Sequence, residues 1–97
     1  MEYNMLKTNS YFDGKVMSIA LENAEGKSTV GVMEAGEYTF GTSTVEYMTV
    51  ISGAMNVLLP GESEWRIYTK GETFVVAKDA KFQLQLAEQS AYHCLYV

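Results

Sequence analysis

The chain has 97 residues and a formal net charge of −5, which allows one folded domain and excludes a basic surface for nucleic acid. An apolar share of 47 % excludes a mainly disordered chain, and no apolar run approaches the roughly 18 residues of a membrane span. With Cys94 as its single cysteine and no signal-peptide pattern at Met1, we expect a reduced, cytoplasmic protein that contacts neither nucleic acid nor membranes.

Short segments rich in Val, Thr, Tyr and Phe alternate with glycines along the chain, a pattern typical of β-strands. No segment has sustained apolar spacing of the helical kind, so the sequence predicts one all-β domain over 1–97. Residues 1–9 are expected to form either a loose arm or an edge strand. The predicted strands span 14–21, 28–34, 36–42, 46–51, 54–59, 64–69, 73–77, 81–87 and 91–97.

Turn signals and strand edges indicate how these strands are joined. Ser52-Gly53 separates two predicted strands at hairpin distance, and Pro60-Gly61 marks the next turn. A chain of short strands must protect its sheet edges, which closure into a barrel or pairing with a second copy achieves. We therefore expect a closed or nearly closed barrel that forms a homodimer.

Alternation assigns side chains to strand faces. At the C-terminus Tyr92, Cys94 and Tyr96 share one face and oppose His93. His93 and Cys94 are adjacent in sequence, so they point to opposite faces and cannot form a catalytic dyad. The sequence favours a surface or interface role for His93 and a small buried thiol for Cys94.

The carboxylate of Glu46 has two interpretations. Glu46 shares a strand face with Met48 and Val50, so an inward-facing strand would place a carboxylate among apolar groups that need compensating partners. Alternatively, Glu46 is a solvent-facing charge at the start of its strand. The usual phosphate-binding glycine loops and the G-x-S-x-G elbow are absent from the sequence.

Two spaced patterns resemble the cupin motifs. Gly36 and Glu46-x6-Gly53 resemble the first motif, G-x5-H-x-H-x3-4-E-x6-G, with Thr42 and Thr44 at its two histidine positions and a shortened spacer. The segment 71–82 resembles the second motif, G-x5-P-x-G-x2-H-x3-N. In that segment Ala77 replaces the proline, Asp79 the glycine and Phe82 the histidine.

Five longer stretches carry a further resemblance: 9–16, Gly31-Val-Met, 36–40, 46–60 and 82–87. They resemble the small pyrimidine/purine nucleoside phosphorylase family, and the resemblance covers nearly the whole chain from Asn9. It implies a single-domain, cupin-like β-barrel of the RmlC-like jelly-roll type. It also implies phosphorolysis of purine or pyrimidine nucleosides to the free base and α-D-ribose 1-phosphate, with broad tolerance of the base.

Phosphorolysis needs an anchored phosphate, a fixed ribose and a surface for the base. We expect Glu46 to be catalytic by holding the ribose hydroxyls as positive charge builds on the sugar. The expected substrate-binding residues are Thr42 and Thr44 for phosphate, Tyr38, Phe82 and Tyr92 for stacking, and Arg66 or Lys15 as the cation. Strand propensity explains the threonines equally well, an apolar core row explains Phe82, and surface packing explains Arg66.

The resemblance also bears on cofactors and on competing functions. With Thr42, Thr44 and Phe82 at the three histidine positions, we expect no metal and no cofactor, with inorganic phosphate as co-substrate. The same loss argues against a metal-dependent dioxygenase. The alternative is a non-enzymatic cupin module that binds a small polar ligand, because a fold does not fix a function.

Overall fold

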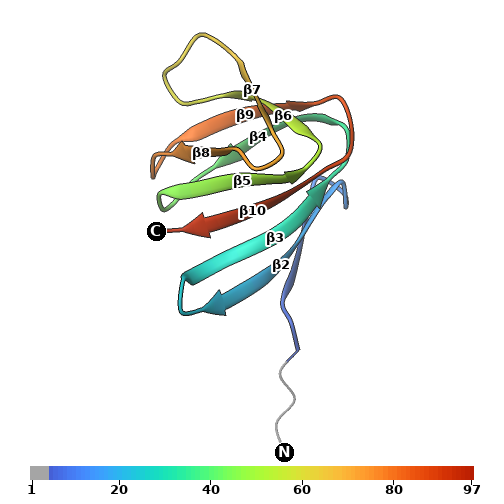
Figure 1. The fold of residues 1–97 in the computed structure, drawn as a ribbon, viewed down its shortest axis with the longest axis vertical. Coiled ribbons are helices and arrows are strands. Elements are labelled where there is room, and N and C mark those ends of the chain that lie inside the picture. The colour runs from blue at the N-terminus through green and yellow to red at the C-terminus, as the bar shows by residue number, and fades with distance from the viewer. Residues whose placement is uncertain (1–4) are drawn as a thin grey trace, which may run out of the picture.

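The computed structural model describes residues 5–97, which form ten β-strands and no helix (Figure 1). All nine predicted strands are present, with their ends shifted by two residues at most. The described residues contain no helix long and apolar enough to cross a membrane. The strands are β1 (Thr8–Tyr11), β2 (Val16–Asn23), β3 (Gly26–Met33), β4 (Gly36–Gly41), β5 (Glu46–Ser52), β6 (Ala54–Leu58), β7 (Arg66–Thr69), β8 (Thr73–Val76), β9 (Lys81–Leu86) and β10 (Ser90–Tyr96).

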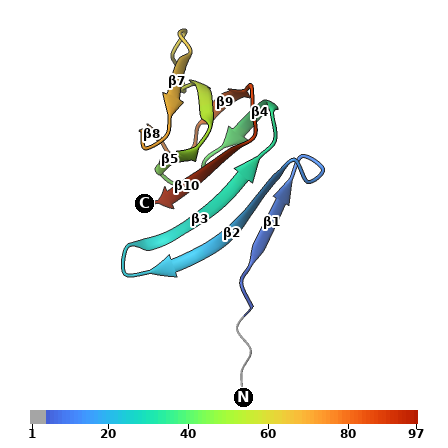
Figure 2. The same ribbon diagram turned by 45° about the vertical axis from the view of Figure 1, so that its right-hand side comes forward.

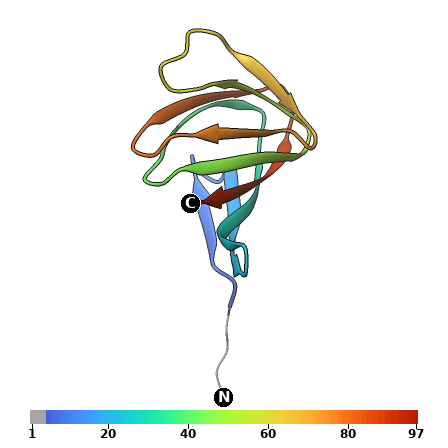
Figure 3. The same cartoon turned by 60° about the vertical axis from the view of Figure 1, so that its left-hand side comes forward.

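The strands form two antiparallel sheets packed face to face, which confirms the predicted all-β jelly-roll fold. One sheet has the order β1-β2-β3-β10-β5-β8 and the other the order β4-β9-β6-β7. The expected closed barrel is wrong, because the two sheets stay separate and the long β2–β3 hairpin extends beyond the smaller sheet (Figure 2). With the left-hand side of Figure 1 turned forward, the 59–65 loop is seen to project from the smaller sheet (Figure 3).

The N-terminal segment supplies an edge strand. β1 pairs with β2, with Asn9 opposite Ser18 and Tyr11 opposite Val16. Of the segment 1–9, Thr8 and Asn9 lie in this edge strand, while residues 1–4 lie outside the described residues. The turn after β1 carries Phe12, whose ring lies 5.1 Å from that of Tyr38 on the opposite sheet. This contact ties the N-terminal edge to β4.

The turn at Ser52-Gly53 is not a hairpin, because β5 and β6 belong to different sheets. Gly53 has a φ of +89°, a conformation that favours glycine, and it redirects the chain from one layer to the other. A Cβ at this position would collide with Ser90. The Ser90 hydroxyl accepts from the backbone N–H of Ala54 at 3.2 Å, which fixes the crossover. Sequence spacing alone does not distinguish such a crossover from a hairpin.

The apolar core fills the space between the sheets. Alternation along β9 buries Phe82, Leu84 and Leu86, as predicted, and leaves the intervening polar residues outside. Between β2, β3 and β10 the inward positions are partly polar, with Ser18 and Thr29 among them. A cavity opens at this less apolar part of the interlayer space. The core comprises Val16, Met33, Tyr38, Met48, Val50, Met55, Val57, Tyr68, Phe74, Val76, Phe82, Leu84, Leu86, Tyr92 and Cys94.

Candidate active site

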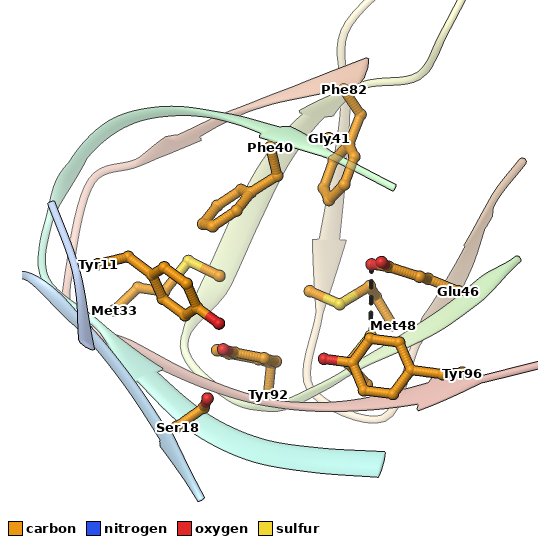
Figure 4. A pocket seen from close by; sticks show the side chains of 11 residues that line it. Tyr11, Ser18, Met33, Phe40, Gly41, Glu46, Met48, Phe82, Tyr92 and Tyr96 are labelled. Carbon is orange, nitrogen blue, oxygen red and sulfur yellow. Dashed lines mark hydrogen bonds between the residues drawn. The ribbon is translucent and has the colours of Figure 1, made fainter. Parts of the chain in front are cut away.

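A cavity of about 210 Å³ lies between the inner face of the six-stranded sheet and the strands β4 and β9. Side chains from both sheets point into it, so its shape depends on how the two layers pack (Figure 4). The lining residues are Tyr11, Ser18, Met33, Phe40, Gly41, Glu46, Met48, Phe82, Tyr92, Cys94 and Tyr96.

Glu46 is the carboxylate of this cavity. It is the first residue of β5, is half-buried, and lies opposite Tyr96 of β10 in the strand register. The thiol of Cys94 donates a hydrogen bond to Glu46 Oε1 at 3.5 Å. Burial raises the pKa of Glu46, and the thiol donor only partly offsets that effect. Burial and the nearby Glu46 charge both raise the pKa of Cys94, so it is a neutral donor rather than a thiolate.

Hydroxyl groups line the side of the cavity opposite the aromatic wall. The Tyr11 and Tyr96 hydroxyls point into the cavity, as does the Glu46 carboxylate (Figure 4). Tyr96 shares a hydrogen bond of 2.9 Å with the hydroxyl of Thr29. Burial raises the pKa of Tyr92 to about 12, so this phenol stays protonated at neutral pH. The cavity therefore offers neutral hydroxyl donors and acceptors beside one carboxylate.

The position of the Tyr92 ring depends on the absence of a side chain at Gly31. It lies opposite Gly31 in the register of β10 and β3. A Cβ built on Gly31 would come within 2.5 Å of the Tyr92 hydroxyl oxygen. The absence of a side chain at Gly31 thus lets the phenol ring lie across β3 toward Ser18.

Two phenylalanines form the apolar wall. The rings of Phe40 and Phe82 are stacked, with centroids 5.8 Å apart and an interplanar angle of 26°. Phe74 supports Phe82 at 6.1 Å in an edge-to-face contact. Such a wall is suited to a flat aromatic ligand.

The structure brings three of the predicted site residues together at the cavity: Glu46, Phe82 and Tyr92. The two threonines expected to bind phosphate lie elsewhere. Thr42 Oγ1 donates to the carbonyl of Ala77 at 2.6 Å and accepts from the N–H of Ala80 at 3.1 Å, so its proton is already used in fastening a turn. The Thr44 hydroxyl oxygen is buried and has no hydrogen-bond partner within the described part of the chain.

The other three predicted residues also lie away from the cavity lining. The Tyr38 hydroxyl donates to the carbonyl of Glu34 at 2.8 Å, and its ring packs in the core. Arg66 begins the edge strand β7, where its guanidinium lies 4.7 Å from the centroid of the Tyr68 ring. Lys15 is exposed in the turn between β1 and β2. The geometry gives no support to these three as substrate-binding residues.

Eight of the lining residues were not predicted as site residues from the sequence, and four of these eight carry a hydroxyl or an aromatic ring: Tyr11, Ser18, Phe40 and Tyr96. Tyr96 was detectable, because it continues the alternating row of Tyr92 and Cys94. Tyr11 was not, since β1 has no apolar alternation and was not assigned as a definite strand. Among residues 5–97, no group of three or more His, Cys, Asp and Glu side chains is placed to hold a metal ion.

Comparisons with known proteins agree with this architecture. The family model "Pyrimidine/purine nucleoside phosphorylase" matches residues 6–96. A protein of that name from Shewanella pealeana is 55 % identical over 92 residues, covering 95 % of this chain and 99 % of the relative. A crystal structure of a protein of unknown function from Vibrio parahaemolyticus is 44 % identical with a TM-score of 0.92, covering 97 % of this chain and 100 % of that one. An RmlC-like cupin from Shewanella frigidimarina has the same fold at 16 % identity, with a TM-score of 0.73 over 92 % of this chain and 80 % of that one.

Proposed function

The chain belongs to the pyrimidine/purine nucleoside phosphorylase family, and on that premise we propose that it cleaves nucleosides with inorganic phosphate. The products are the free purine or pyrimidine base and α-D-ribose 1-phosphate. The observation that carries the proposal is the cavity in which one half-buried carboxylate, Glu46, lies opposite a stacked pair of phenyl rings. A ribose and a base need these two kinds of surface.

Glu46 suits the ribose. A carboxylate accepts hydrogen bonds from two neighbouring hydroxyls more strongly than a neutral group does. Its hydrogen-bond partner in the structure is a weak thiol donor, Cys94, so ribose hydroxyls would replace a poor hydrogen bond with better ones. The negative charge also stabilises the positive charge that builds at the anomeric carbon, and it is therefore worth more in the transition state than in the bound nucleoside.

The wall of Phe40 and Phe82 suits the base. Stacking depends on the π-face that every base has, so this contact does not discriminate between purines and pyrimidines. Hydrogen bonds to base edges would impose discrimination, and the aromatic wall supplies none. Broad tolerance of the base follows from this arrangement.

The reaction balances without a cofactor. A phosphate oxygen forms a bond to the anomeric carbon from the face opposite the base, while the bond from that carbon to the base nitrogen breaks. The electron pair of the broken bond stays on the base, which takes up a proton. In the proposed reaction a neutral tyrosine hydroxyl such as that of Tyr92 would donate a hydrogen bond to the departing base. The proposed reaction needs no metal, because the three histidine positions of the cupin metal site carry Thr42, Thr44 and Phe82.

An assay for base release tests this function against a non-enzymatic binding role. The protein is incubated with uridine or adenosine, with and without inorganic phosphate, and the free base is quantified by chromatography. We expect release that requires phosphate, yields ribose 1-phosphate in equal amount, and persists after dialysis against a chelator. Binding of nucleoside without release in either arm would favour the ligand-binding alternative, and activity restored only by a divalent ion would contradict the metal-free reaction.

A further inference from the structure

The cavity that holds Glu46 is poorly suited to an anion. Among the described residues that line it, Glu46 is the only one with a formal charge, and that charge is negative. Inorganic phosphate at neutral pH carries between one and two negative charges, so a phosphate placed beside Glu46 would be repelled. At about 210 Å³ the cavity is also smaller than typical small-molecule sites of roughly 300–1,000 Å³. Nucleoside and phosphate therefore need additional space and a cation.

A second cavity, of about 460 Å³, adjoins the first and supplies the additional space and the cation. The two cavities share Tyr11 and Tyr96 in their linings, so these two rings form the boundary between them. The second cavity lies at the open end of β1, β2 and β3, beside the chain that leads into β1. Together the two cavities fall within the size range of small-molecule sites.

Two lysines line the second cavity, Lys7 and Lys27. Lys27 precedes the buried Thr29 by two residues in β3 and lies opposite Tyr96 in the strand register, and its side chain is exposed. The backbone carbonyl of Lys7 accepts from the N–H of Ala20 at 2.8 Å, which fixes the backbone of Lys7 beside β2. The lining of the second cavity thus contains two lysines, one of them directly across from the boundary residue Tyr96.

Polar groups and one carboxylate complete this lining. Asn9, Ser28 and Thr29 provide neutral donors, and the Thr29 hydroxyl is hydrogen-bonded to Tyr96 at the boundary. Glu22 is also present and lies opposite Lys27 in the register of β2 and β3. Its negative charge offsets one lysine, so the cavity has a net positive charge of one, against a net negative charge of one in the cavity of Glu46.

We propose that the second cavity is the phosphate subsite, in which Lys7 and Lys27 bind inorganic phosphate next to the nucleoside held by Glu46 and the phenylalanine wall. This inference rests on the proposed phosphorolysis. It separates the two anions of the reaction, because the boundary residues Tyr11 and Tyr96 stand between the phosphate and Glu46. Phosphate approaches the anomeric carbon across this boundary, from the side away from the aromatic wall.

Charge-altering variants test the subsite. In K7Q and K27Q we expect the KM for phosphate at saturating nucleoside to rise by about 10- to 150-fold, the range for losing one hydrogen bond to a charged group. The KM for nucleoside at saturating phosphate should change less than twofold. E22Q should lower the KM for phosphate, because it removes the opposing charge. Two matched controls, K70Q and K78Q, alter exposed lysines that line neither cavity and should leave both KM values unchanged.

Direct binding separates failure of the subsite from failure of the reaction. Titration calorimetry with inorganic phosphate alone should show binding to the parent that weakens in K27Q and strengthens in E22Q. If the parent releases base but K7Q and K27Q behave like K70Q in both KM and calorimetry, the subsite is wrong and phosphorolysis stands. If the parent releases no base yet binds phosphate in a Lys27-dependent way, the reaction is wrong and the anion site stands. Circular dichroism and thermal unfolding confirm that each variant is folded.

Discussion

At the scale of single residues, the ionisation of Glu46 sets a pH dependence. Burial raises the pKa of Glu46 above its ordinary value of 4.5, so the free enzyme loses the carboxylate at a higher pH than an exposed glutamate would. We expect kcat/KM to fall on the acid side with a midpoint above 4.5. The folded state also binds more protons than the unfolded state in this window, so the free energy of unfolding falls as pH rises through it.

The thiol of Cys94 supplies a matched pair of variants for this prediction. C94A removes the hydrogen-bond donor that lowers the pKa of Glu46, so the acid midpoint should move to higher pH. C94S keeps a donor and should retain a midpoint close to that of the parent. The measurement is kcat/KM for one nucleoside from pH 4 to pH 9. An unchanged midpoint in C94A would contradict the contact between Cys94 and Glu46.

At the scale of the strands, one glycine positions one aromatic ring. G31A adds a Cβ that would lie 2.5 Å from the Tyr92 hydroxyl oxygen, so the ring must move. The φ of Gly31 is not positive, so the backbone accepts alanine and the effect is confined to this contact. We expect G31A to fold, to lose roughly 1–3 kcal/mol of stability through overpacking, and to lose activity. The double variant G31A/Y92F should recover little of the stability, because it removes only the oxygen and leaves the ring carbons Cζ and Cε1 at 2.6 and 2.7 Å from the added Cβ.

Thermal unfolding and base release measure both effects. The control is G61A at the turn after β6, where an added Cβ has nothing within 4 Å but the φ of +76° disfavours alanine. It should lower stability without lowering kcat/KM. If G31A retains the parent's stability and activity, that result would contradict the inference that the packing of Tyr92 on Gly31 positions the ring.

Alternation of apolar residues made the strands predictable from the sequence. It did not predict which of the two sheets each strand joins. The rows of β9 and β10 follow directly from the apolar spacing of Phe82, Leu84 and Leu86 and from that of Tyr92 and Cys94. The sequence does not show that the chain changes sheets at Gly53, since a turn of this length serves hairpins and crossovers equally well. The edge strand β1 has the sequence Thr-Asn-Ser-Tyr, whose polar residues carry no periodic signal.

The candidate site was predictable where it follows strand alternation. Glu46 and Tyr92 lie on inward rows, and Phe82 lies on the row that faces them. Position in the cupin pattern alone led to Thr42, whose hydroxyl is instead used by the backbone of the turn at 77–80. The position of the Thr42 side chain is determined by hydrogen bonds to a segment that is distant in sequence, and no local sequence pattern predicts such bonds. The same reason explains why the lysines of the second cavity were not anticipated.

At the scale of the whole molecule, the outer face of the six-stranded sheet predicts a homodimer. Met17, Ile19, Leu21, Val30 and Val32 gather on this face with 40–52 % of their surfaces exposed. Their neighbours across β2, β3 and β10, including Ala91, His93 and Leu95, carry no carboxylate, lysine or arginine in the register. In a chain of net charge −5, an uncharged apolar face is the one on which two copies meet without repulsion.

The oligomeric state in solution tests this prediction. Light scattering should give twice the chain mass of 10.8 kDa for the parent, and I19K or V30K should give a monomer of unchanged fold. I67K places the same charge on the exposed Ile67 of β7, in the other sheet, and should stay dimeric. A monomeric parent, or a dimer that persists in both I19K and V30K, would contradict the proposed face.

We propose that the carboxylate of Glu46 stabilises the transition state, and the E46Q variant tests this role. Glutamine keeps the shape but removes the charge, which we expect to cost about 2–4 kcal/mol, or roughly 30- to 1000-fold in kcat/KM. The matched control E62Q changes an exposed carboxylate in the loop before β7 and should match the parent. The measurement is kcat/KM for phosphate-dependent release of base by the three proteins at pH 7. We expect a loss of that size for E46Q alone, and a folded E46Q whose kcat/KM lies within about threefold of the parent's would contradict this role of Glu46.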